Sequence, residues 1–277
     1  MGGSSSGSRP CETVGVDGPN QAIRSLRDAG EPRVRRPAPS RRTVGLVFAL
    51  LTVTFGSALA APLITVDDPS WRLESSYDSI ALYRGSVRGS GVVPVKLVMT
   101  IPGTIEEVSL VLEDIPRRPD WIGNRTESVL LERASDYDQL EYLHVDMPWP
   151  ACDRSAVIRA QVEVSDDRRR ATISAESVES HAADRFPKFV RARVYASTFQ
   201  MSQAPGRVEV VALVFIDPCG IIPKWIVNYF ARRVARGTLS GLRRQVAKKL
   251  YSKAQVEAMH RRMWAYPSLG EKKAATP

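Results

Sequence analysis

The sequence is poor in the residues and motifs that most catalytic and metal-binding sites use. It has three histidines and three cysteines in 277 residues. None of them stands at a spacing typical of zinc ligands, and no G-x-S-x-G motif marks a nucleophile. His144 alternates with Tyr142 and Asp146 opposite an apolar strand face, so we interpret it as a surface histidine rather than a general base. We therefore expect no catalytic residue, no metal and no cofactor.

The chain also lacks a recognisable nucleic-acid-binding module, although its formal net charge is +9. Much of that charge lies in the first 60 residues, which carry eight arginines and four acidic residues. No zinc spacing and no basic strand interleaved with stacking aromatics accompanies it. The composition therefore argues against nucleic acid as the main partner.

The N-terminal region predicts export. Residues 1–40 are rich in Gly, Ser, Pro and Arg without apolar periodicity, which indicates a disordered leader. Residues 41–60 have the pattern of a signal peptide: two arginines, about a dozen apolar residues and a small-residue end at Ala60. That apolar run is too short for a comfortable membrane span. We expect cleavage after Ala60 and a periplasmic or secreted protein; an uncleaved N-terminal membrane anchor is the alternative.

The following region predicts an α+β fold. Strand-like runs at 80–87 and 92–101 precede a short helix at 105–113. Six further strand candidates follow, separated by short turns, at 127–134, 139–147, 156–165, 170–178, 190–201 and 207–216. One long helix ends the series. A curved antiparallel sheet wrapped around that C-terminal helix is the economical arrangement. We assign residues 61–255 to this domain and 256–277 to a basic tail.

The long helix is the most informative element. Pro223 suits its first position, and apolar residues recur along it at three- and four-residue steps. The opposite face is basic, and no acidic residue occurs between Lys224 and Leu250. The helix either caps a core with a solvated basic face or covers an apolar cavity and also contacts an anionic membrane.

Strand parity predicts two buried charges. From Ala156 onward the even positions of the strand are apolar, and Arg154 shares their parity just before it. In the preceding strand, Glu141 shares a face with Leu143 and Val145. Two inward charges are costly unless they pair or contact a polar ligand group. Alternatively, both lie beyond the regular strands, where parity fails.

Four segments resemble the START domains, the lipid-transfer family related to steroidogenic acute regulatory protein. Residues 149–157 (WPACDRSAV) are similar to the PWP-x-SDRDFV segment of bacterial members. Residues 79–84 (SIALYR) resemble the opening DGIxVYxR, and 119–121 (PDW) the YPxW after the first long helix. Residues 217–228 (DPCGIIPKWIVN) are similar to DPGGxIPxWLVN before the terminal helix. The resemblance covers roughly residues 71–252, with departures at Cys152, Ser155 and Cys219.

The resemblance implies a helix-grip fold that encloses an apolar tunnel for one lipid or other large hydrophobic molecule, closed by the terminal helix. Arg154 would be the buried cation offered to a polar ligand group, with Glu141 beside it. Four aromatic residues would line or close the tunnel, or else pack in an ordinary core: Trp121, Trp149, Trp225 and Tyr229. We predict lipid binding and transfer without catalysis; an aromatase/cyclase-like enzyme of the same superfamily is the alternative.

Two further expectations concern the tunnel mouth. The membrane contact would comprise apolar residues at the helix start and basic residues near its end: Ile221, Ile222, Arg243, Arg244, Lys248 and Lys249. Cys152 and Cys219 precede elements that meet at this mouth, so they could form a disulfide; two free thiols are the alternative. We expect a monomer whose partners are a hydrophobic small molecule and an anionic membrane surface.

Overall fold

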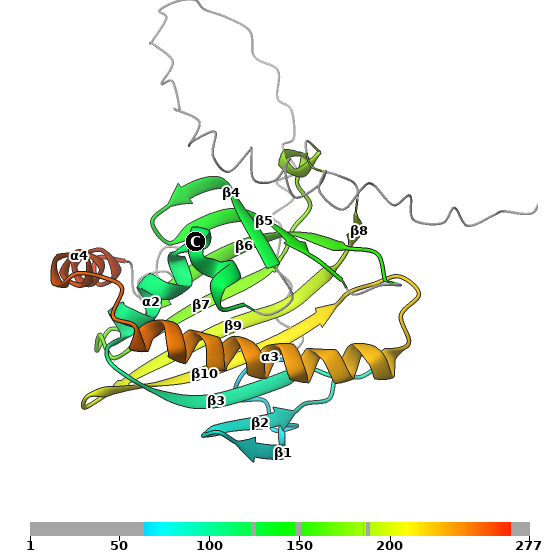
Figure 1. Ribbon diagram of the computed structural model, residues 1–277, viewed down its shortest axis with the longest axis horizontal. Helices are drawn as coiled ribbons and strands as arrows, with labels where there is room; N and C mark the ends of the chain where they lie inside the picture. Colours follow the sequence, from blue (N-terminus) through cyan, green and yellow to red (C-terminus); the bar gives the residue numbers. More distant parts are fainter. Residues whose placement is uncertain (1–63, 123–125, 148–150, 185, 187–188, 267–277) are drawn as a thin grey trace, which may run out of the picture.

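The computed structural model describes residues 64–122, 126–147, 151–184, 186 and 189–266. The predicted leader, the signal peptide, Trp149 and residues 267–277 of the tail lie outside the described residues. Figure 1 shows a large curved sheet with helix α3 (Lys224–Ala247) lying across it. The predicted α+β fold, an antiparallel sheet with a long C-terminal helix, is confirmed.

The sheet is antiparallel except at one short strand. Its order is β1-β2-β3-β10-β9-β7-β6-β5-β4, and β8 pairs with β6 in parallel. Strands β1 and β4 therefore form the two edges of the main sheet. In chain order the elements before α3 are β1 (Arg72–Tyr77), β2 (Ile80–Arg84), β3 (Val95–Pro102), α2 (Ile105–Glu113), the 3-10 helix η1 (Ile115–Asp120), β4 (Thr126–Ser135), β5 (Asp138–Val145), β6 (Arg154–Val164), β7 (Arg170–Ser177), the 3-10 helix η2 (His181–Ala183), β8 (Val190–Arg191), β9 (Arg193–Ala204) and β10 (Arg207–Asp217).

The main core lies between the sheet and helices α2 and α3. Helix α2 begins with a capping box in which Thr104 and Glu107 satisfy each other's backbone N–H groups. The C-terminal half of α3 buries Leu239, Leu242 and Val246 in the same core. Gly241 lets α3 approach η1 closely, because a Cβ atom at this position would lie 2.2 Å from the carbonyl oxygen of Trp121.

A further helix, α4 (Lys253–Met263), extends the domain past the predicted boundary at residue 255. Met259, Met263 and Tyr266 are buried in the main core, and α4 packs against α2. The residues from 256 to 266 are therefore part of the folded domain rather than a tail. No helix in the described part of the chain is long and apolar enough to cross a membrane.

A second, smaller core covers the outer face of β5 and β6. The ring of Tyr142 stacks on Phe186 from the β7–β9 connection, with centroids 4.0 Å apart. His144 lies beside it against Phe189 and is only 1% exposed. The prediction of a surface histidine is therefore wrong. Parity identified the face opposite the cavity correctly, but it could not show that a distant connection covers that face.

Candidate functional site

A cavity of about 370 Å³ lies between α3 and the inner face of the sheet. One wall is formed by apolar side chains of α3, including Ile226, Phe230 and Val234, and the other by strands β5, β6, β7, β9 and β10. The cavity reaches Val93, Pro218 and Ile222 at the N-terminal end of α3. Its volume falls in the range of small-molecule sites in proteins, and its lining is mainly apolar.

A buried ion pair between Arg118 of η1 and Glu141 of β5 forms one polar group of this cavity. The guanidinium contacts both carboxylate oxygens, one of them at 3.2 Å from Nη2 to Oε1. Gln139 donates a further hydrogen bond of 2.6 Å to Glu141. Arg118 also donates to the Leu112 carbonyl, at 3.2 Å from Nε and 3.0 Å from Nη2. This charge pair is therefore neutral overall, and its hydrogen bonds are largely satisfied within the protein.

Glu141 faces the cavity as parity predicted, but its partner is Arg118 and not Arg154. Sequence reasoning missed Arg118 because it lies in a proline-flanked 3-10 helix, where neither a period of two nor one of 3.6 applies. The sequence signal that could have indicated this partner was the predicted burial of Glu141, since a fully buried carboxylate requires a nearby cation or hydrogen-bond donors.

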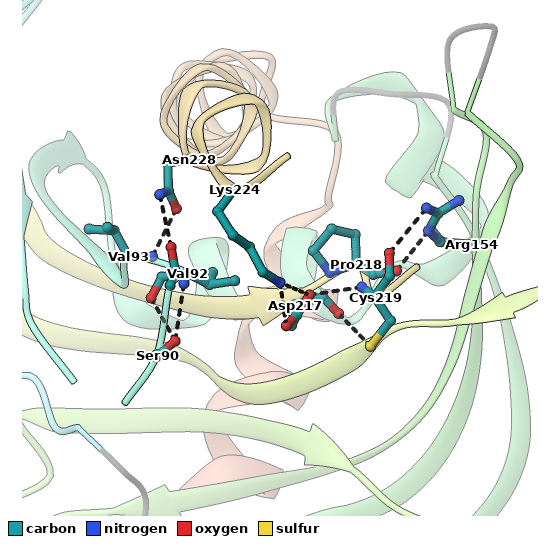
Figure 2. A network of polar contacts seen from close by, with 10 residues as sticks. Ser90, Val92, Val93, Arg154, Asp217, Pro218, Cys219, Lys224 and Asn228 are labelled. Carbon is teal, nitrogen blue, oxygen red and sulfur yellow. Dashed lines mark hydrogen bonds and ion pairs between the residues drawn. The ribbon is translucent and has the colours of Figure 1, made fainter. Parts of the chain in front are cut away.

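Arg154 also lines the cavity, and it holds the turn that precedes α3 (Figure 2). Its Nε donates to the Pro218 carbonyl at 2.7 Å and its Nη2 to the Cys219 carbonyl at 3.2 Å, while Nη1 donates to the Cys152 carbonyl. Burial lowers the pKa of the Arg154 guanidinium. Among the described residues, no carboxylate lies within ion-pair distance of it. Arg154 is thus a buried cation held by backbone oxygens.

The N-terminal end of α3 is fastened to two loops (Figure 2). Asn228 accepts a hydrogen bond of 2.8 Å from the Val93 N–H and donates one of 3.1 Å to the Gly91 carbonyl. Lys224 forms an ion pair of 3.0 Å with Asp217 at the end of β10. Burial would raise the pKa of Asp217, but the Cys219 N–H and Lys224 outweigh it and hold that pKa below its usual value. These contacts close the chain around the end of the cavity.

Of the aromatic residues predicted to line or close the tunnel, one lines the cavity and two residues of α3 do not. Trp121 is buried and lines the cavity. Trp225 is 73% exposed and Tyr229 is 53% exposed, and neither lines it. Ile226 and Phe230 of the same helix line the cavity instead, and the attachment of Asn228 to the 91–93 loop is one of the contacts that hold α3 in this orientation. Trp149 is outside the described residues.

The residues predicted to contact the membrane differ in their exposure and in their ion pairs. Ile221 is 99% exposed, whereas Ile222 lines the cavity. Arg243 pairs with Asp78, and Lys249 pairs with Glu107 at 2.7 Å. Arg244 and Lys248 are exposed and form no ion pair with any described residue. Part of the basic surface of α3 and the residues that follow it is therefore paired with acidic residues of the β1–β2 turn and α2.

The disulfide between Cys152 and Cys219 is absent, because Cys219 has a free thiol. The turn places Cys219 in the left-handed region, at φ 56°, and directs its carbonyl oxygen toward Arg154. Its Sγ instead contacts the Asp217 carbonyl oxygen at 3.6 Å. The described residues contain no group of three or more side chains suited to hold a metal ion.

Comparison with known proteins gave consistent results. No family model matches the chain. A Pseudomonas aeruginosa protein, described only as uncharacterized, is 28% identical over 183 residues, which are 65% of this chain and 88% of that protein. Mouse phosphatidylcholine transfer protein is 26% identical over 180 residues, covering 63% and 81% of the two chains. The solved structure of a STAR-related lipid transfer protein from Xanthomonas axonopodis has a TM-score of 0.56 at 25% identity, covering 64% of this chain and 99% of that one.

Proposed function

We propose that this protein, which has the fold of the START domain proteins, binds one lipid or other large hydrophobic molecule in the cavity beneath α3. The resemblance to START domains that the sequence motifs indicated is confirmed by the solved structures. The observation that carries the proposal is the apolar cavity of about 370 Å³ with a charged pair, Arg118 and Glu141, in its wall. Two of the similar proteins are named as lipid transfer proteins.

The polar groups of the cavity would orient the ligand. Arg118 and Glu141 neutralise each other, so they suit a hydroxyl, carbonyl or amide group that exchanges hydrogen bonds with the pair. Arg154 has no carboxylate partner among the described residues and offers its remaining N–H groups to an acceptor. Arg154 also fastens the 217–220 turn, so its removal would loosen the cavity end as well as weaken ligand binding.

Ligand exchange requires an opening, and the contacts around Asn228 and Lys224 are the ones that an opening would break. They join α3 to the 91–93 loop and to the end of β10, beside cavity-lining Val93 and Pro218. A few hydrogen bonds and one half-exposed ion pair are weak enough to open without unfolding the domain. We infer that the protein transfers its ligand between membranes by movement of these loops.

Binding and transfer of a hydrophobic ligand, without chemical conversion, is the function that the site supports best. Among the described residues, no histidine or cysteine side chain lines the cavity, and His144 lies on the opposite face of the sheet. An enzyme of the aromatase/cyclase type would convert a bound polyketide or ester, so mass spectrometry of such a compound before and after incubation would reveal turnover. We expect the compound to be recovered unchanged.

Native mass spectrometry of the protein isolated from its own host tests ligand binding. We expect a complex with one hydrophobic molecule that organic extraction releases for identification. Ala231→Phe, which places a ring into the cavity, should abolish that complex, whereas Ala247→Phe at the exposed end of α3 should retain it. Ligand-free protein from the host, together with no binding of any of a panel of lipids, would refute the proposal.

A further inference from the structure

A second pocket lies on the other side of α3, against the edge strand β1. It has a volume of about 230 Å³ and shares no lining residue with the apolar cavity. Three arginines of α3 dominate it: Arg232, Arg233 and Arg236. Tyr229 and residues of β1 and β2 complete its wall. We propose that this pocket binds the phosphate of an anionic phospholipid in the bilayer, and so docks the protein for the exchange of its cargo.

The pocket has an excess of positive charge. Arg232 pairs at 3.0 Å with Glu74, the one carboxylate that the described residues contribute to the pocket wall. Arg236 donates to the neutral hydroxyl of Ser75 at 2.7 Å. Arg233 is exposed and has no ion pair among the described residues. Two guanidinium charges are therefore uncompensated within one helical turn, and guanidinium groups match the oxygens of a phosphate in geometry and charge.

The surface next to the pocket suits a bilayer better than a dissolved anion. Ile221, Trp225 and Tyr229 follow one another at four-residue intervals and are 99%, 73% and 53% exposed. Trp225, Tyr229 and Arg233 therefore share one face of α3, and Ile221 lies in the turn that precedes the helix. Exposed aromatic residues beside arginines are typical of surfaces that lie at the membrane interface. A nucleic acid or acidic protein would leave the apolar end of this stripe without a partner.

The location also links docking to exchange. Ile222, Ile226 and Phe230 belong to the same segment as the exposed stripe, but they line the apolar cavity. A bilayer that contacts Trp225 and the arginine pocket would therefore lie beside the end of the cavity. This inference rests on the proposed carrier function, because it names the membrane component that the carrier recognises.

The pocket differs from the membrane contact that the sequence suggested nearer the end of α3. Arg243 and Lys249 are engaged by Asp78 and Glu107. Arg244 and Lys248 are exposed, like Arg233, but they do not line the pocket. They therefore provide controls in which the same charge is removed from the same helix.

Co-sedimentation with vesicles tests the proposal. The parent protein should bind vesicles of phosphatidylglycerol and phosphatidylcholine, and bind pure phosphatidylcholine more weakly. Arg233→Gln should lower the affinity for the anionic vesicles by roughly fivefold, and Arg233→Gln with Arg236→Gln by roughly 25-fold, from the typical contribution of one basic residue near such a surface. Arg244→Gln, alone or with Lys248→Gln, should change it less than twofold. Equal losses in the two sets would mean that net charge alone attracts the membrane, and would overturn the pocket assignment.

Two further measurements separate the alternatives. Calorimetry with inorganic phosphate should show no binding at millimolar concentration, because a free anion lacks the apolar contact; tight binding there would make the pocket a site for soluble phosphate. Native mass spectrometry of the Arg233→Gln protein should show the same hydrophobic cargo as the parent. Loss of cargo from every variant and from the parent would contradict the carrier function, whereas retained cargo with unchanged vesicle binding would contradict only the pocket.

Discussion

Glu141→Gln is expected to destabilise the protein strongly, because it leaves the Arg118 guanidinium buried without a counter-charge. Glu141 is fully buried and the Arg118 side chain is 14% exposed, so water compensates little for the loss. Removing one partner of a buried ion pair typically costs about 3–5 kcal/mol of unfolding free energy. The glutamine retains one acceptor for Arg118, so we expect about 3 kcal/mol. For a domain of this size that corresponds to a decrease of roughly 6–12 °C in the midpoint of thermal unfolding.

Urea unfolding followed by circular dichroism would measure this effect, with two comparison variants. Arg118→Met with Glu141→Leu removes both charges and should lie within about 2 kcal/mol of the parent, since apolar replacements of a buried pair are often neutral. Arg159→Gln breaks the more exposed pair with Asp138 and should cost less than about 1 kcal/mol. If Glu141→Gln were as stable as the parent, the carboxylate could not be the counter-charge of Arg118. Ligand binding should fall in the double variant as well, because the Arg118–Glu141 ion pair in the cavity wall is lost.

Three other predictions follow from the fold and the sequence. Asn228→Ala should accelerate release of bound ligand several-fold, measured by fluorescence after mixing with acceptor vesicles, with little change in stability; an unchanged rate would mean that the cavity opens elsewhere. Gly241→Ala should lower the free energy of unfolding, measured in urea, by about 1–3 kcal/mol because the methyl group would clash with the Trp121 carbonyl. The control Gly237→Ala, which has open space around it, should raise the free energy of unfolding by up to about 1 kcal/mol. N-terminal sequencing of the cellular protein should begin at Ala61; recovery of the leader would instead support the uncleaved membrane anchor.

Local pattern was sufficient to predict most of the elements. The strands show a clear period of two, and α3 begins at Lys224, directly after the Pro223 expected to start it. Parity placed Arg154 and Glu141 on the inner face, and the structure has both there. These properties depend on neighbours within a few residues, which is the range over which periodicity and turn chemistry act. Helix α4 was missed because its sequence is short and mostly polar.

Tertiary structure decided which side chains meet. Arg118 pairs with Glu141 although 22 residues separate them, because η1 packs against the start of β4 and thereby reaches the neighbouring strand β5. The same is true of His144, which the β7–β9 connection covers, and of Cys219, whose carbonyl oxygen accepts a hydrogen bond from Arg154 while its sulfur contacts the Asp217 carbonyl.

The sequence by itself determined a curved antiparallel sheet, a long basic helix and two inward charges. It could not determine how far α3 rotates about its own axis, because the helix has apolar residues on more than half of its circumference near its start. Asn228 helps to fix that rotation through the 91–93 loop, which is more than 130 residues away in the chain, as do the ion pairs of Arg232 with Glu74 and Arg243 with Asp78. Such long-range contacts place Ile226 and Phe230 in the cavity lining and leave Trp225 and Tyr229 outside it, at the surface.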